Sequence, residues 1–199
     1  MTAPLLELDA VRIRHEGTAR ATPDGVSLDI RAGEVVLDAA GRLVRPTLDA
    51  LDGGDVLVVV ATGGRPVEEV GPLPSNARAA EFLPYDLLMP KVDVFVTNAG
   101  FGGTQYALSH GVPIVAAGDT EDKPEVSTRV EWAGVGVNLK TGTPPAADVR
   151  AGVERVLGDP GYRERARALA RRIRDMDTFG MIAAELEAAA ARTVGTRVG

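Results

Sequence analysis

Residues 94–111 have the sequence VFVTNAGFGGTQYALSHG, and this stretch decides the fold. The apolar run at 94–97 predicts a buried β-strand, and the glycines that follow it predict a turn. Residues 104–110 then predict a helix that stops at Gly111. The order strand, glycine turn, helix is typical of one unit of a parallel α/β sheet.

The glycine turn is a candidate anion site. In an open parallel sheet, ligands bind outside the carboxyl ends of the strands. Backbone N–H groups of Gly100, Gly102 and Gly103 would lie there, at the positive end of the predicted helix, where a phosphate is held well. A tight strand-to-helix crossing that merely needs glycine explains the same residues equally well.

The chain on either side of this unit continues the alternation of helix and strand patterns. Residues 55–61, DVLVVVA, form the continuous apolar run expected of a parallel strand covered on both faces. We therefore predict an α/β fold, a Rossmann-like parallel sheet with helices on both faces. The expected strands are 55–61, 79–82, 92–97, 112–117 and 135–139, and the expected helices are 42–51, 104–110, 123–133, 146–157, 162–175 and 179–192.

The last two predicted helices differ in charge. Residues 162–175 are rich in arginine, whereas residues 179–192 are acidic and rich in alanine. Opposite charges on neighbouring helices predict that the two pack against each other, and a basic helix resting against a further domain explains the charges equally well.

Residues 1–37 follow a different pattern. Apolar residues alternate with polar ones at period two, for example at Leu6, Leu8, Val26 and Leu28, with turn residues between the runs. This pattern predicts short antiparallel strands before the parallel sheet. We accordingly divide the chain into residues 1–37, an antiparallel segment, and residues 38–199, a Rossmann-like domain.

Composition excludes several classes of protein. The 199 residues include no cysteine, which excludes disulfides and thiolate metal sites, and we expect no metal. A net charge of −6 argues against nucleic acid as the main partner. Apolar runs are too short for a membrane span and no signal peptide is evident, so we expect a cytoplasmic protein.

Two further segments would lie at the same edge of the sheet as the glycine turn. Residues 118–123, GDTEDK, follow a predicted strand and offer polar groups to sugar hydroxyls, or simply cap the next helix through Asp119 or Thr120. Residues 82–85, FLPY, offer a ring and backbone amides to a flat base, or form a core phenylalanine beside a turn.

These segments together resemble a known family. The order and spacing of FLPY at 82–85, VFVTNAGFGG at 94–103, GVP at 111–113 and Asp122-Lys123 look like the donor-binding signature of family 1 glycosyltransferases. Those enzymes have two Rossmann-like domains, the GT-B fold, and glycosylate macrolides, polyketides and other small lipophilic acceptors. The resemblance implies that this chain is a single GT-B half that binds a nucleotide diphosphate sugar of the UDP or TDP type, without a further cofactor.

The resemblance also implies roles for individual residues. Phe82 occupies the position of the aromatic residue that stacks on the base, and Leu83 that of the residue whose backbone pairs with the base. Asn98 falls where most members carry a histidine that contacts the diphosphate. The turn around the phosphates would be formed by Gly100, Gly102, Gly103 and Thr104.

The sugar-binding positions match the family motif only in part. Asp122 and Lys123 correspond to the acidic residue and glutamine that hold the sugar hydroxyls, so Lys123 brings a cation where the family has an amide. Tyr106 stands where plant members use a glutamate on the ribose. These departures leave the sugar and the base undetermined.

The catalytic histidine of the family lies in an amino-terminal acceptor domain for which this chain has no room. We therefore assign no catalytic residue. His15, among the predicted amino-terminal strands, and His110, at the end of a predicted helix, are interpreted as structural.

Residues 5–36 resemble the opening antiparallel strands of an ABC-transporter ATPase. In that family the strands lead into a P-loop, whose Gly-Lys pair occurs nowhere in this sequence. We infer a join between unrelated pieces near residues 35–41, and this interpretation excludes ATP hydrolysis.

Three hypotheses for function remain. The first is a glycosyltransferase donor domain, incomplete alone and complemented by a separate acceptor-domain subunit. The second is a non-catalytic nucleotide-binding module or a relic of a gene fusion. The third, an ABC-transporter ATP-binding fragment, lacks its P-loop.

Overall fold

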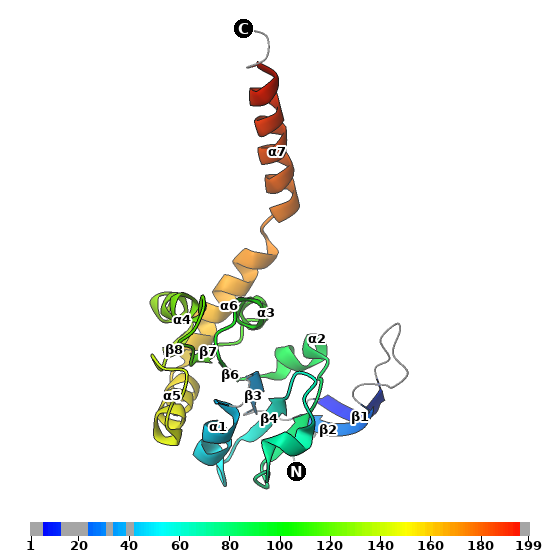
Figure 1. Cartoon of the computed structure of the whole chain (residues 1–199), viewed down its shortest axis with the longest axis vertical. Coiled ribbons are helices and arrows are strands. Elements are labelled where there is room, and N and C mark those ends of the chain that lie inside the picture. Colours follow the sequence, from blue (N-terminus) through cyan, green and yellow to red (C-terminus); the bar gives the residue numbers. More distant parts are fainter. Residues whose placement is uncertain (1–5, 13–23, 31–33, 39–41, 196–199) are drawn as a thin grey trace.

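The computed structural model describes residues 6–12, 24–30, 34–38 and 42–195, and side chains between residues 42 and 188. Within these residues, six parallel strands form one sheet in the order β5-β4-β3-β6-β7-β8 (Figure 1). The strands are β3 (Glu34–Asp38), β4 (Leu57–Ala61), β5 (Ala77–Ala80), β6 (Val94–Thr97), β7 (Ile114–Ala116) and β8 (Gly136–Asn138).

Helices cover both faces of this sheet. Helices α1 and α5 pack on one face, and α2, α3, α4 and α6 pack on the other. The helices are α1 (Val44–Leu51), α2 (Tyr85–Leu88), α3 (Phe101–Ser109), α4 (Lys123–Trp132), α5 (Ala146–Gly158), α6 (Pro160–Arg174) and α7 (Thr178–Gly195), with short 3₁₀ turns at Val67–Val70 and Met89–Lys91. The predicted Rossmann-like sheet with helices on both faces is confirmed.

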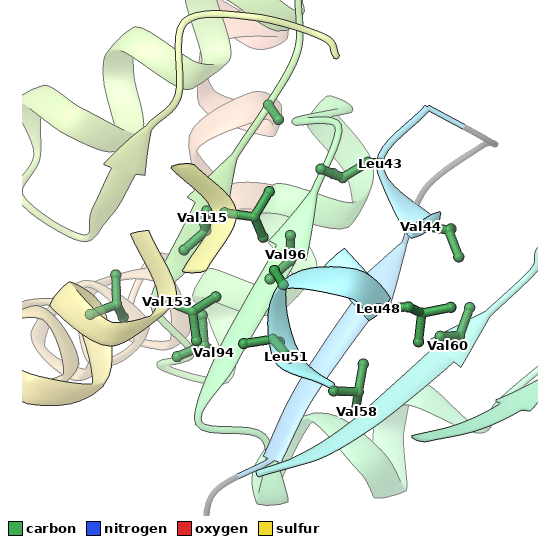
Figure 2. Close-up of a cluster of buried hydrophobic side chains, with 14 of the residues drawn as sticks. Leu43, Val44, Leu48, Leu51, Val58, Val60, Val94, Val96, Val115 and Val153 are labelled. Carbon is green, nitrogen blue, oxygen red and sulfur yellow. The ribbon is translucent and has the colours of Figure 1, made fainter. Parts of the chain in front are cut away.

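The first face is an aliphatic core. Figure 2 shows Leu48 and Leu51 of α1 against Val58 and Val60 of β4, with Val153 of α5 beside the next strands. All five side chains are buried. Burying each of them contributes about 1.5–3 kcal/mol, which explains why β4 is an apolar run.

The second face contains the aromatic core. Phe95 of β6 is fully buried, and the ring of Tyr85 meets it edge-on at 6.3 Å between centroids. Helix α6 is tied to the start of β6 because Arg163 donates hydrogen bonds to the Val92 carbonyl (2.9 Å) and to Asp93 (2.7 Å). Burial lowers the pKa of Arg163, and neighbouring Asp93 opposes that shift.

Helix α3 begins three residues earlier than predicted. Gly100 is its N-cap, so Gly102 and Gly103 lie in the first turn and not in a preceding loop. Both glycines were expected in the turn that precedes the helix, but both belong to the helix itself.

The amino-terminal strands are partly as predicted. Strands β1 (Leu6–Arg12) and β2 (Asp24–Ile30) pair antiparallel, as the alternation indicated. The prediction was wrong for residues 34–37, because β3 pairs in parallel with both β4 and β6. The run Val35-Val36-Leu37 is continuously apolar, which is the mark of a central parallel strand.

The position of β3 bears on the division of the chain. A boundary between residues 37 and 38 would fall inside this strand, so we propose to place it before Glu34. The resemblance of residues 5–36 to an ABC-transporter ATPase stays a prediction, and residues 39–41 of the inferred join lie outside the described residues.

The predicted pairing of the last two helices is wrong. Helix α7 leaves the end of α6 and projects away from the sheet (Figure 1), and its side chains between residues 178 and 188 are exposed. If α7 packed on α6, its apolar side chains would be buried. Phe179 is instead 87% exposed and Leu186 is 65% exposed.

No helix in the described part of the chain is long and apolar enough to cross a bilayer.

Candidate functional site

The predicted site residues lie along one edge of the sheet. Because its six strands are parallel, their carboxyl ends share this edge, and the loops after β5, β6 and β7 carry the candidates. The strand order reverses between β3 and β6, since α1 leaves β3 on one face and α3 leaves β6 on the other. In this class of fold, ligands bind at such a switch point, outside the carboxyl ends of the strands.

Two local hydrogen bonds, each from a backbone N–H to a side chain two residues earlier, shape the turn after β6. The Ala99 N–H donates to Thr97 Oγ1 at 3.2 Å, and the Gly100 N–H donates to Asn98 Oδ1 at 3.2 Å. Ala99 is fully buried with φ of 61°, a left-handed conformation that costs a non-glycine residue about 1 kcal/mol. This turn places the start of α3 at the carboxyl edge of the sheet.

The first turn of α3 is suited to an anion. No side chain of the described residues caps it, and its first turn has no acidic residue, so the positive end of the helix is not neutralised locally. A Cβ added at Gly102 would have no atom within 4 Å, which means that the space beside this turn is open. Backbone N–H groups here can donate to phosphate oxygens.

Thr104 adds an orphaned polar group to the same turn. Its side chain is 1% exposed, and its Oγ1 has no hydrogen-bond partner among the described residues. A buried hydroxyl without a partner is costly, so Thr104 places an unsatisfied polar group at the start of α3.

Gly118 brings the loop after β7 against this turn. A Cβ at Gly118 would overlap the Asn98 carbonyl oxygen, and it would lie 2.6 Å from the Cβ of Lys123. Asn98 and Lys123 are therefore neighbours, although they belong to different loops. The structure brings together the predicted phosphate and sugar positions.

Lys123 is anchored near the site by its own loop. Its side chain is 17% exposed, pairs with Glu121 and donates to Thr120 Oγ1 at 3.4 Å. The hydrogen bond from Lys123, together with its charge, lowers the pKa of Glu121. The ammonium group is thus held by Thr120 and Glu121 of its own loop.

The alternative that Asp119 or Thr120 caps the next helix is not what the structure shows. Asp122 is the N-cap of α4, and its exposed side chain makes no capping hydrogen bond. Asp119 instead pairs with Arg42 at 2.9 Å. The Asp122 carboxylate is therefore available to a ligand.

Phe82 and Leu83 differ in exposure. Phe82 is 43% exposed, and its Cζ lies 2.8 Å from the position of a Cβ on Gly64, so the ring stands over the loop after β4. The Gly64 N–H donates to the Glu81 carbonyl at 3.0 Å and holds this loop in place. Leu83 packs its side chain against the core, which leaves only its backbone for a ligand.

The candidates follow one another along the edge. Adjacent strands lie about 4.8 Å apart, so the ends of β5 and β6, three strand positions apart, are separated by about 14 Å. Phe82 lies at the β5 end, Asn98 at the β6 end and Lys123 after β7. An extended nucleoside diphosphate attached to a sugar can span this order of base, phosphate and sugar positions.

His110 lies at the end of α3 that points away from this edge. His110 is the C-cap of α3, and its Nδ1 lies 2.9 Å from the Tyr106 carbonyl. The Tyr106 ring is tilted against the rings of His110 and Tyr85, with centroid separations of 4.7 Å and 6.3 Å. His15 lies outside the described residues.

Within the residues that the structure describes, no group of three His, Cys, Asp or Glu side chains is placed to hold a metal ion.

Comparison with known proteins identifies the family. Residues 45–188 match the family described as "Erythromycin biosynthesis protein CIII-like, C-terminal domain". The chain belongs to this family. Residues 45–188 correspond to the C-terminal domain of GT-B glycosyltransferases of family 1, as the sequence motifs indicated.

Individual relatives of this EryCIII-like domain agree. The chain is 47% identical over 140 residues to 4'-demethylrebeccamycin synthase from Lentzea aerocolonigenes, covering 70% of this chain and 32% of the relative. It is 44% identical over 131 residues to UDP-glucosyltransferase 1 of Beauveria bassiana, covering 64% and 28%. The chain thus spans about a third of the length of these curated relatives.

A solved structure shows the same fold. The calicheamicin glycosyltransferase CalG4 superposes with a TM-score of 0.69 and 26% identity, over 81% of this chain and 44% of that one. The EryCIII-like domain described here therefore corresponds to one half of a GT-B enzyme.

Proposed function

We propose that this chain binds a nucleotide diphosphate sugar of the UDP or dTDP type as the donor half of a glycosyltransferase. The observation that carries the proposal is the uncapped first turn of α3 at the switch point of the sheet, with open space at Gly102 and a buried, unpartnered hydroxyl at Thr104. Relatives that are named as UDP-glucosyltransferases support the same class of donor.

The proposed contacts follow the order of the loops. Phe82 stacks on the base and the Leu83 backbone pairs with it, while Asn98 and the α3 turn hold the diphosphate. Asp122 and Lys123 bind the sugar hydroxyls. The phosphate contacts come from Gly100, Gly102, Gly103 and Thr104.

The proposed reaction needs a second domain. An acceptor hydroxyl loses its proton to a histidine of that domain and attacks the anomeric carbon from the side opposite the diphosphate. The bond from the anomeric carbon to the diphosphate oxygen breaks with inversion, and the leaving diphosphate carries away the electron pair. Amide groups of the α3 turn stabilise that developing charge. This chain supplies donor binding and leaving-group stabilisation, and we assign it no catalytic residue.

The acceptor half would come from a separate subunit, and a small lipophilic alcohol is the proposed acceptor class. Both statements, and the cytoplasmic location expected from the sequence, stay predictions.

Calorimetric titration of the chain with UDP, dTDP and uridine tests donor binding. We expect the diphosphates to bind at least tenfold more tightly than uridine, because charge-assisted hydrogen bonds to the phosphates each contribute roughly 1.5–3 kcal/mol. Equal or undetectable affinity for all three compounds would contradict the proposal. Donor-sugar hydrolysis with and without a candidate acceptor subunit then distinguishes an enzyme half from a non-catalytic module.

A further inference from the structure

One ion pair crosses the carboxyl edge of the sheet. Arg42, between β3 and α1, donates from Nη2 to Asp119 Oδ1 at 2.9 Å, and Asp119 follows β7. Strand β6 lies between β3 and β7. The pair therefore bridges the carboxyl end of β6, which is where the Asn98 turn begins.

Asp119 is held on a second side. Gly142, in the loop between β8 and α5, is buried against the Asp119 carboxylate so closely that a Cβ at Gly142 would overlap it. The Asp119 carboxylate thus lies between that loop and the Arg42 guanidinium. It fixes the guanidinium where the pair crosses the carboxyl end of β6.

Stabilisation of the fold is a weak reason for this pair. The side chains of Arg42 and Asp119 are 54% and 39% exposed, and ion pairs of such exposure contribute about 0–1 kcal/mol. A guanidinium has five N–H donors in a planar fork. The bond to Asp119 uses one nitrogen, Nη2, and the exposed group has further donors to offer.

The proposed phosphate turn itself carries no formal charge. Asn98 is neutral, and residues 99–109 include no basic side chain. Lys123 is the neighbouring cation, and it is paired with Glu121. A diphosphate that leaves with negative charge would gain from a fixed cation at this place, and arginine matches phosphate geometry with two parallel hydrogen bonds.

We propose that Arg42 binds the diphosphate of the donor across the end of β6, and that Asp119 is the positioning residue that holds its guanidinium there. This inference rests on the proposed function, because it assigns an additional cation to that same site.

The test uses the full chain and measures affinity for UDP and for uridine at low and high salt. For Arg42→Gln, we expect UDP affinity at low salt to fall by about tenfold or more, with a flatter salt dependence and unchanged uridine affinity. Arg42→Lys should retain the salt dependence but recover only part of the affinity. Arg129→Gln is the matched control, because Arg129 loses the same charge from an exposed pair with Glu125 on α4.

The role of Asp119 is tested in two backgrounds. Asp119→Asn removes a repulsive charge and an anchor at once, whereas in the Arg42→Gln background it removes only the repulsion. We therefore expect it to improve UDP affinity clearly in the Arg42→Gln background and to improve it less, or to weaken it, when Arg42 is present. An equal effect in both backgrounds would overturn the positioning role.

The remaining outcomes separate the two proposals. Unchanged UDP affinity in Arg42→Gln, or an equal loss for UDP and uridine, overturns the role of Arg42 while leaving donor binding intact. If the unaltered chain binds no UDP, both proposals fail.

Discussion

Gly118 packs against the carbonyl oxygen of Asn98 so closely that any side chain at position 118 would overlap it. This contact joins the loop after β7 to the turn after β6, and it sets the distance between the proposed phosphate and sugar positions. A substitution at Gly118 should therefore disturb the site, although it changes no charge and removes no residue that is proposed to bind the donor.

Gly118→Ala should lower the free energy of unfolding by about 1–3 kcal/mol, since the added methyl must displace backbone. Urea denaturation measures the loss. Gly102→Ala is the control, because a Cβ at Gly102 meets open space and alanine favours a helix by up to about 1 kcal/mol over glycine. Equal stability of the two variants would mean that the Gly118 contact is not tight.

Gly102→Val should abolish UDP binding while the protein stays folded. The valine side chain would occupy the open space beside the first turn of α3, which is where we place the phosphates. Calorimetry measures binding and circular dichroism follows folding. Gly158→Val serves as the control, since Gly158 also faces open space but ends α5 away from the candidate loops. A Gly102→Val variant that binds UDP normally would rule out this phosphate position.

Phe82→Ala should weaken UDP and uridine alike, by roughly tenfold, because stacking of a base on an aromatic ring contributes about 1–3 kcal/mol. The exposure of the Phe82 ring means that thermal stability should change little. Trp132→Ala removes another exposed aromatic side chain, on α4, and should leave both affinities unchanged. Loss of UDP affinity without loss of uridine affinity would show that Phe82 does not contact the base.

The pair of Glu121 and Lys123 should respond to acid. Because Lys123 lowers the pKa of Glu121, the pair is intact above the ordinary pKa range of a glutamate and is lost as pH falls through the lowered value. An NMR titration of the Glu121 carboxyl group should show this lowered pKa, and Lys123→Met should return it to the ordinary range. A Glu121 pKa that is unaffected by Lys123→Met would contradict the pairing.

The part of the fold that could be predicted from the sequence is local in the chain. The apolar strand at Val94–Thr97 and the glycines after it specify a strand, a turn and a helix within a few residues. The parallel sheet followed from the repetition of such units. The predicted site residues were expected along one edge for the same reason, because consecutive parallel strands end on the same side.

The contacts that complete the site depend on distant residues. Arg42 and Asp119 are 77 positions apart, and no local pattern indicates that they meet. The packing of Gly118 on Asn98 likewise depends on how two loops approach each other. For β3, the period-two interpretation failed because a short apolar run has no clear period until its neighbours in the sheet are known.

Amide NMR spectra recorded during titration with UDP and, separately, with uridine provide the most direct test of anion binding at the start of α3. The account predicts that UDP produces large, saturable shifts of the Gly100, Gly102 and Gly103 amide signals, which uridine does not reproduce. If UDP shifts other amide signals but leaves these three unchanged, the account is contradicted.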